Sequence, residues 1–239
     1  MHNTDFAAQA HSALQQLLAQ PPPQLQELHL EVDEGVGFDH EVLTALDASG
    51  LQQLRKLVVA GPLPELSVLP AQLQQLDLGY CEYEEQLLAA VMPLQQLTAL
   101  SFIVGFEEPE PLLLLAQLPA LQELRLAPLY MDWRAAVATA PAWGQLPQLR
   151  ELETQFGEGV AGTWPQLMAV VAGVAAATAL TKLVLWVPDL IDLIDLTGGD
   201  DEQAGVNDEG GQQQGPLDVC ASIAGLTRLK ELDAAAAGN

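Results

Sequence analysis

The sequence predicts an α/β solenoid in which parallel strands form one layer and helices form the other. Two observations carry this prediction. A short leucine-based phrase returns about eight times along the 239 residues, and several segments between its copies have the apolar spacing of helices. Because a repeat of this kind cannot bury its apolar face alone, neighbouring copies must stack on one another.

The repeated phrase reads Leu-x-x-Leu-x-Leu, and Leu-Pro or Leu-Gln usually precedes it. Side chains alternate along a strand, so the leucines of each copy share one face. The middle residue of each copy is Leu28, Leu57, Leu76, Leu100, Leu124, Leu152, Leu183 or Leu232. The last gap is about twice the others, so it holds either an insertion or one decayed repeat.

Helices are predicted in the segments that connect the copies. Pro111 and Pro165 lie near the first position of two such segments, where the missing N–H costs nothing. Asp132 is a good N-cap residue for another. The predicted helices are Phe38–Leu46, Tyr83–Val91, Glu110–Leu118, Asp132–Thr139, Trp164–Thr178 and Asp218–Leu226.

The third copy, Leu73-Gln-Gln-Leu76-Asp-Leu78-Gly-Tyr-Cys81, resembles the leucine-rich-repeat consensus L-x-x-L-x-L-x-x-N/C. The units with helices look most like the ribonuclease-inhibitor-like or F-box-associated subclass of leucine-rich-repeat proteins. The resemblance implies a curved parallel sheet inside, helices outside and about eight irregular repeats. It also implies a role in binding other proteins.

Three parts are expected along the chain. Residues 1–189 form the repeat array, residues 190–216 an acidic and partly disordered insert, and residues 217–239 a final repeat. Solenoids usually carry polar capping repeats, and the sequence shows none at either end. This indicates a piece of a longer protein, or end strands that pair with something else.

The charge of the chain restricts its partners. Eight Lys and Arg against 32 Asp and Glu give a formal net charge of −24, which argues against binding nucleic acid or an anionic membrane. No apolar run is long enough to span a bilayer, and the first residues do not read as a secretory signal. Two cysteines are too few for a disulfide framework. We therefore expect a cytoplasmic or nuclear protein.

The predicted concave surface is the first candidate site. With the leucines inward, positions 3, 5 and 7 of each phrase face this surface. Arginine and aromatic side chains dominate the energetics of protein interfaces. The residues expected to bind a protein partner are Lys56, Asp77, Arg125, Glu151, Glu153, Lys182 and Trp186. The alternative is that the basic side chains pair with carboxylates on neighbouring strands and keep the strands from repelling each other.

A second candidate site lies in the acidic insert. Its sequence resembles a SUMO-interacting motif, which adds a short strand to an exposed sheet edge of SUMO. The residues that carry this resemblance are Leu193, Ile194, Asp195, Leu196 and Thr197, with Asp200 and Asp201 after them. The alternative is a degenerate repeat strand, or an apolar patch packed on the array, followed by a solvated acidic loop.

Sequence motifs for catalysis are missing. The chain contains no G-x-S-x-G, no phosphate-binding loop, no H-E-x-x-H and no C-x-x-C. We therefore predict a non-enzymatic protein-interaction module without metal or cofactor. The alternatives are a SUMO-binding adaptor, a fragment of an F-box-type substrate receptor of a ubiquitin ligase, and the regulatory repeat region of a larger enzyme.

Overall fold

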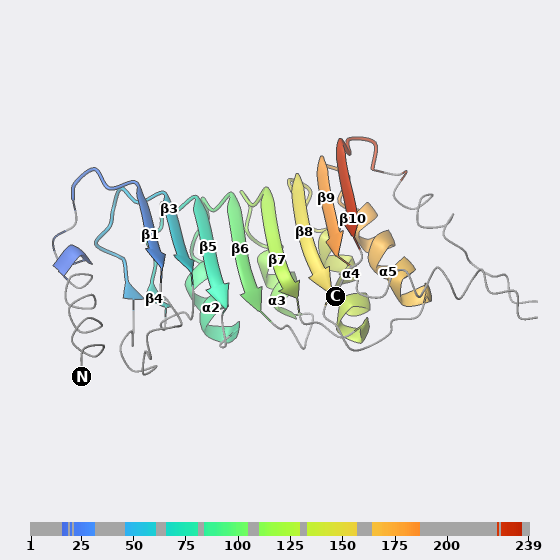
Figure 1. The fold of residues 1–239 in the computed structure, drawn as a ribbon, viewed down its shortest axis with the longest axis horizontal. Coiled ribbons are helices and arrows are strands. Elements are labelled where there is room, and N and C mark those ends of the chain that lie inside the picture. The colour runs from blue at the N-terminus through green and yellow to red at the C-terminus, as the bar shows by residue number, and fades with distance from the viewer. Residues whose placement is uncertain are drawn as a thin grey trace, which may run out of the picture.

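Eight parallel strands form one open, uncurled sheet in the computed structural model of this chain (Figure 1). The structure describes residues 16–18, 20, 22–31, 46–60, 66–80, 84–104, 110–129, 133–156, 164–186, 224 and 226–235. The strands follow one another in sequence order across the sheet. They are β1 (Glu27–Glu31), β3 (Lys56–Ala60), β5 (Gln75–Tyr80), β6 (Ala99–Val104), β7 (Glu123–Leu129), β8 (Glu151–Phe156), β9 (Lys182–Trp186) and β10 (Glu231–Ala235).

A second layer of connecting elements covers one side of the sheet (Figure 1). Its elements change from strand to helix along the chain. They are β2 (Leu46–Asp47), β4 (Leu66–Val68), α2 (Glu84–Val91), α3 (Glu110–Leu115), α4 (Trp133–Trp143) and α5 (Trp164–Ala175). β2 and β4 pair with each other as a separate two-stranded parallel sheet. The molecule is thus an α/β solenoid of leucine-rich-repeat type, with one strand of the large sheet in each repeat.

The pairing register places equivalent residues of successive repeats side by side. Each middle leucine of the phrase is the direct partner of the middle leucine in the next strand, from Leu28 on β1 to Leu232 on β10. All eight copies found in the sequence are therefore strands of one ladder. β9 pairs directly with β10 over five residues.

A tight turn precedes each strand of the large sheet, and it recurs in every copy of the phrase. The first leucine of every copy donates its N–H to the carbonyl three residues earlier, as Leu97 does to Leu94 at 3.0 Å and Leu149 to Leu146 at 3.1 Å. The residue after that leucine then accepts two N–H groups from the next repeat, as Gln74 O does from Thr98 and Ala99. These bonds satisfy the backbone at the sheet edge, which buried polar groups require.

The core lies between the two layers and consists mainly of leucine. Leu57, Leu100 and Leu124 on the strands are at most 1% exposed, and Val91 and Val174 meet them from the helices. Each fully buried side chain of this kind contributes roughly 1.5–3 kcal/mol. Because every repeat supplies the same positions, the array buries one continuous core instead of several small ones.

The predicted helices agree with α2 to α5, with shifted ends. α3 stops at Leu115, three residues before the predicted end, and α4 continues past Thr139 through Pro141 to Trp143. Leu46 lies in a strand and not at the end of a helix. The 190–216 insert and nearly all of the predicted helix Phe38–Leu46 lie outside the described residues. So does most of the predicted helix Asp218–Leu226, of which residues 224 and 226 are described and are not helical.

The short repeat between β3 and β5 uses an extended segment, which the sequence did not predict. Only 19 residues separate the middle leucines Leu57 and Leu76, and β4 occupies the return path. A strand advances about 3.3 Å per residue and a helix about 1.5 Å. An extended segment therefore covers the return distance with the fewest residues.

Candidate protein-binding face

The side of the sheet opposite the helices, here called the sheet face, carries two rows of side chains in register. Position 3 of the phrase supplies the first row, and position 5 supplies the second. The first row is Glu27, Lys56, Gln75, Ala99, Glu123, Glu151, Lys182 and Glu231. The second row is His29, Val58, Asp77, Ser101, Arg125, Glu153, Val184 and Asp233. These two rows confirm the arrangement that the sequence predicted for positions 3 and 5.

The rows point away from the core. The leucines between them are buried in seven of the eight strands, whereas most row residues are exposed or half-buried. Val184 is the buried exception, at 7% exposure. The rows contain seven carboxylates and three basic side chains, a formal charge of −4. The sheet face is therefore polar and mildly acidic, in keeping with the acidic chain as a whole.

Position 7, which the sequence also places on this face, is not aligned in register across the middle of the sheet. After position 5 the register shifts between β5 and β6, between β6 and β7, and between β7 and β8. In each case β5 or β7 uses one residue more than its neighbour, as in a β-bulge, and a one-residue slip turns a side chain to the other side of the sheet. Position 7 stays aligned only toward the two ends of the sheet, at Glu31 with Ala60 and at Gln155 with Trp186 and Ala235.

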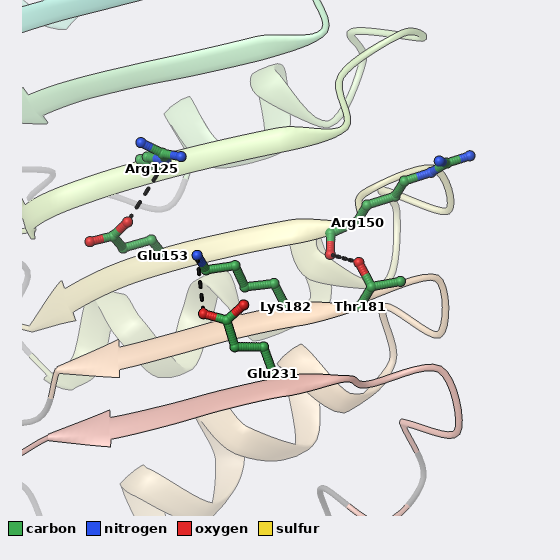
Figure 2. Close-up of polar contacts among 6 residues, drawn as sticks. All are labelled: Arg125, Arg150, Glu153, Thr181, Lys182 and Glu231. Atoms are coloured by element: carbon green, nitrogen blue, oxygen red, sulfur yellow. Dashed lines mark hydrogen bonds and ion pairs between the residues drawn. The ribbon is translucent and has the colours of Figure 1, made fainter.

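Two ion pairs connect neighbouring strands on the last four strands of the sheet face. Arg125 Nε on β7 lies 3.8 Å from Glu153 Oε2 on β8, and Lys182 Nζ on β9 lies 3.2 Å from Glu231 Oε1 on β10. Figure 2 shows both pairs, and also shows Arg150 extending away from them at the start of β8. Exposed pairs of this kind stabilise a fold by at most about 1 kcal/mol. They agree with the alternative that charges on neighbouring strands neutralise one another.

A hollow lies on the sheet face over β6, on the N-terminal side of the ion pairs. Its volume is about 190 Å³, and Lys56, Gln75, Asp77, Ala99, Ser101, Glu123 and Arg125 line it. The cause is side-chain length. Ala99 and Ser101 on β6 are short, whereas their register partners on β5 and β7 are long: Gln75 and Glu123 beside Ala99, and Asp77 and Arg125 beside Ser101.

The sequence-predicted residues divide into two groups that share Arg125. Lys56, Asp77 and Arg125 line the hollow. Arg125, Glu153, Glu151 and Lys182 form a continuous patch, since Arg125 pairs in register with Glu153 and Glu151 with Lys182. Trp186 ends β9 and pairs with Gln155. The SUMO-type residues Leu193, Ile194, Asp195, Leu196, Thr197, Asp200 and Asp201 lie outside the described residues and stay a prediction.

Three contributors to this face were not among the predicted site residues. Glu123 completes the acidic lining of the hollow, and Ala99 and Ser101 create the space. The sequence contains a signal for them. At positions 3 and 5, β6 is the one described strand with a small side chain in both rows.

Metal-binding clusters and membrane-spanning helices are absent from the described part of the chain. Within it, no three His, Cys, Asp or Glu side chains come together in a way that could hold a metal ion. None of the helices described is both long enough and apolar enough to cross a bilayer.

The likeness of this chain to a known protein is structural and distant. No family model and no curated protein matches this sequence. Among solved structures, the chain is similar to an internalin (inlF) from Listeria monocytogenes. The two are 12% identical, the alignment covers 95% of this chain and 75% of the internalin, and the TM-score is 0.34. A likeness of this size carries no argument, so the fold assignment rests on the strand ladder itself.

Proposed function

We propose that this chain is a non-enzymatic interaction module that holds a partner protein on its sheet face. The observation that carries the proposal is the pair of side-chain rows, which run in register across all eight strands. Rigid elements position binding groups more accurately than loops do. A surface built on a paired sheet is prepared before a partner arrives, which lowers the entropic cost of binding.

The dimensions of the sheet face suit a protein better than a metabolite. Neighbouring strands lie about 4.8 Å apart, so eight strands extend about 34 Å. Strands of about six residues extend about 20 Å in the other direction. The product, about 700 Å², is close to the roughly 800 Å² that each partner buries in a standard protein interface. A partner that covers most of the sheet would therefore form a complete interface.

The competing interpretation is that the charged rows serve only the sheet. The Arg125–Glu153 and Lys182–Glu231 pairs fit that interpretation. It gives no role to the hollow, because Asp77 and Glu123 are carboxylates that make no ion pair with any other described residue. An experiment that separates binding from stability decides between the two interpretations.

The experiment compares Arg125→Glu with Arg150→Glu in affinity capture from an extract of the source organism. Both variants make the same charge change on neighbouring repeats, but Arg125 lies on the sheet face and Arg150 extends away from it (Figure 2). We expect a set of proteins that wild type and Arg150→Glu retain and Arg125→Glu loses, with thermal unfolding unchanged. Equal capture by all three chains would contradict the proposal.

A second candidate function rests on the sequence of the acidic insert. We propose that Leu193, Ile194 and Leu196 add a strand to SUMO, with Asp200 and Asp201 meeting basic residues beside it. In an NMR titration, SUMO shifts that disappear with Ile194→Ala and Leu196→Ala would support it, and no shifts would contradict it. The F-box-type role, the role as a regulatory region and the cytoplasmic or nuclear location stay predictions beside it.

A further inference from the structure

The hollow over β6 is small for a binding site. Its volume is about 190 Å³. Sites for small-molecule ligands occupy roughly 300–1,000 Å³. The hollow is therefore too small for such a ligand and matches a single side chain of a bound protein.

The charges that line the hollow favour a cation. Two of its side chains are basic and two are acidic, but Arg125 directs Nε toward Glu153 at 3.8 Å, outside the hollow lining. Asp77, Glu123 and Lys56 make no ion pair with the other residues that the structure describes. The four lining charges sum to zero, and together with Glu153, which pairs with Arg125, they have a formal charge of −1, within rows of −4 and a chain of −24. Charge complementarity steers a positive side chain to this place.

The positions of the two carboxylates favour arginine over lysine. Asp77 stands on β5 in the second row, and Glu123 stands on β7 in the first row, so their positions lie diagonally on either side of Ala99 and Ser101. Two strand spacings of about 4.8 Å and two residues of about 3.3 Å along the strand put these positions about 12 Å apart. A guanidinium is planar, has five N–H donors on several sides and can bridge two acceptors, whereas an ammonium is a compact, strongly hydrated point charge.

We propose that the hollow over β6 receives an arginine side chain of the partner protein, with Asp77 and Glu123 as its two acceptors. Ser101 supplies a hydroxyl beside the site, and Ala99 leaves the space. Lys56 stands on β3, two strands from β6, and stays on the side of the hollow away from Glu123. This inference rests on the proposed function, since it names the group by which a partner would be held on the sheet face.

The test is an NMR titration of the full chain with N-acetyl-arginine methylamide. N-acetyl-citrulline methylamide is the neutral control of the same shape, and acetate tests for an anion site, all at matched ionic strength. We expect shifts of the Ala99 and Ser101 amides with the arginine probe only. Asp77→Asn and Glu123→Gln should each weaken binding at least threefold, and the double variant should abolish it.

The matched control variant is Glu27→Gln. Glu27 stands in the same row as Glu123, but it lies on β1 and is outside the hollow lining, so this variant should bind the probe as wild type does. Equal response to the citrulline probe, a response to acetate instead, or an equal loss with Glu27→Gln would overturn the arginine assignment. Capture that depends on Arg125 but a failed titration would overturn this inference and leave the proposed function in place.

Discussion

The two layers of this solenoid differ in how strictly they repeat. In the sheet layer every repeat contributes the same leucine, buried in seven of the eight strands, the same turn and the same register through position 5. In the connecting layer the element changes from the short strand β4 to the 12-residue helix α5. The difference shows that stacking constrains the strands of a solenoid closely, while the return path has only to cover a distance and bury an apolar side.

The largest expected effect tests whether stacking, and not residue type, gives the sheet layer its stability. Leu124 and Leu232 occupy the same position of the phrase, but Leu124 is 0% exposed and Leu232 is 49% exposed. We expect Leu124→Ala to lower the free energy of unfolding by about 2–5 kcal/mol, since it removes a fully buried side chain and leaves a cavity. Urea unfolding measures this change.

Leu232→Ala is the matched control for that measurement. Its side chain has about half of the burial, so the loss should be about 1 kcal/mol or less. If the two variants lose the same free energy, stacking on both sides is not what distinguishes the central repeats, and the comparison between layers fails.

The next effect concerns the connecting layer, where two helices approach closely. A Cβ built on Gly173 of α5 would lie 2.5 Å from the Ala140 Cβ and 2.6 Å from the Ala140 Cα and carbonyl oxygen on α4. The backbone atoms cannot move without shifting α4, so Gly173→Ala should lower the free energy of unfolding by about 1–3 kcal/mol despite the better helix propensity of alanine.

Gly50→Ala provides the comparison for this helix contact. A Cβ on Gly50 would lie 3.5 Å from the Leu18 carbonyl oxygen, an ordinary contact. This variant should be neutral or slightly stabilising, because it reduces the freedom of the unfolded chain. Chemical denaturation of both variants checks the pair, and a neutral Gly173→Ala would show that α4 and α5 are not packed this closely.

The strand layer was predictable because each phrase contains the alternation of inward and outward side chains that defines a strand. The eight middle leucines and the outward rows at positions 3 and 5 follow from local alternation alone, and the ladder confirms them. The register shifts that interrupt the alignment of position 7 were not predictable, because a bulge in β5 or β7 depends on how neighbouring strands fit. The Gln148 side chain donates to the Leu118 carbonyl of the neighbouring repeat at 2.9 Å. This hydrogen bond likewise depends on how two repeats fit together, so a single phrase does not predict it.

The candidate site was predictable only in part for a related reason. Arg125 and Glu153 occupy the same position in successive phrases, so the sequence places them side by side. The hollow depends on the contrast between Ala99 and Ser101 on one strand and longer side chains on its neighbours. Such a contrast becomes visible when the phrases are aligned as rows, and the separate reading of each phrase misses it.

The smallest effect tests a residue that breaks the uniformity of the sheet layer. Thr154 is 0% exposed, and its Oγ1 has no hydrogen-bond partner among the described residues. Its register partners on β7 and β9 are Leu126 and Leu185. A buried hydroxyl without a partner costs free energy that an apolar group of the same shape does not. Thr154→Val should therefore raise the free energy of unfolding by about 1 kcal/mol.

Thr98→Val makes the same chemical change with the opposite expected sign. The Thr98 hydroxyl donates to the Gln74 carbonyl at 3.0 Å, at the turn that enters β6. Losing this bond should lower the free energy of unfolding by about 0.5–1 kcal/mol, because such a bond is worth about that much net. Thermal unfolding of the two variants side by side measures both signs. Destabilisation by Thr154→Val as well would mean that the hydroxyl on β8 has a partner, and that β8 is as regular as its neighbours.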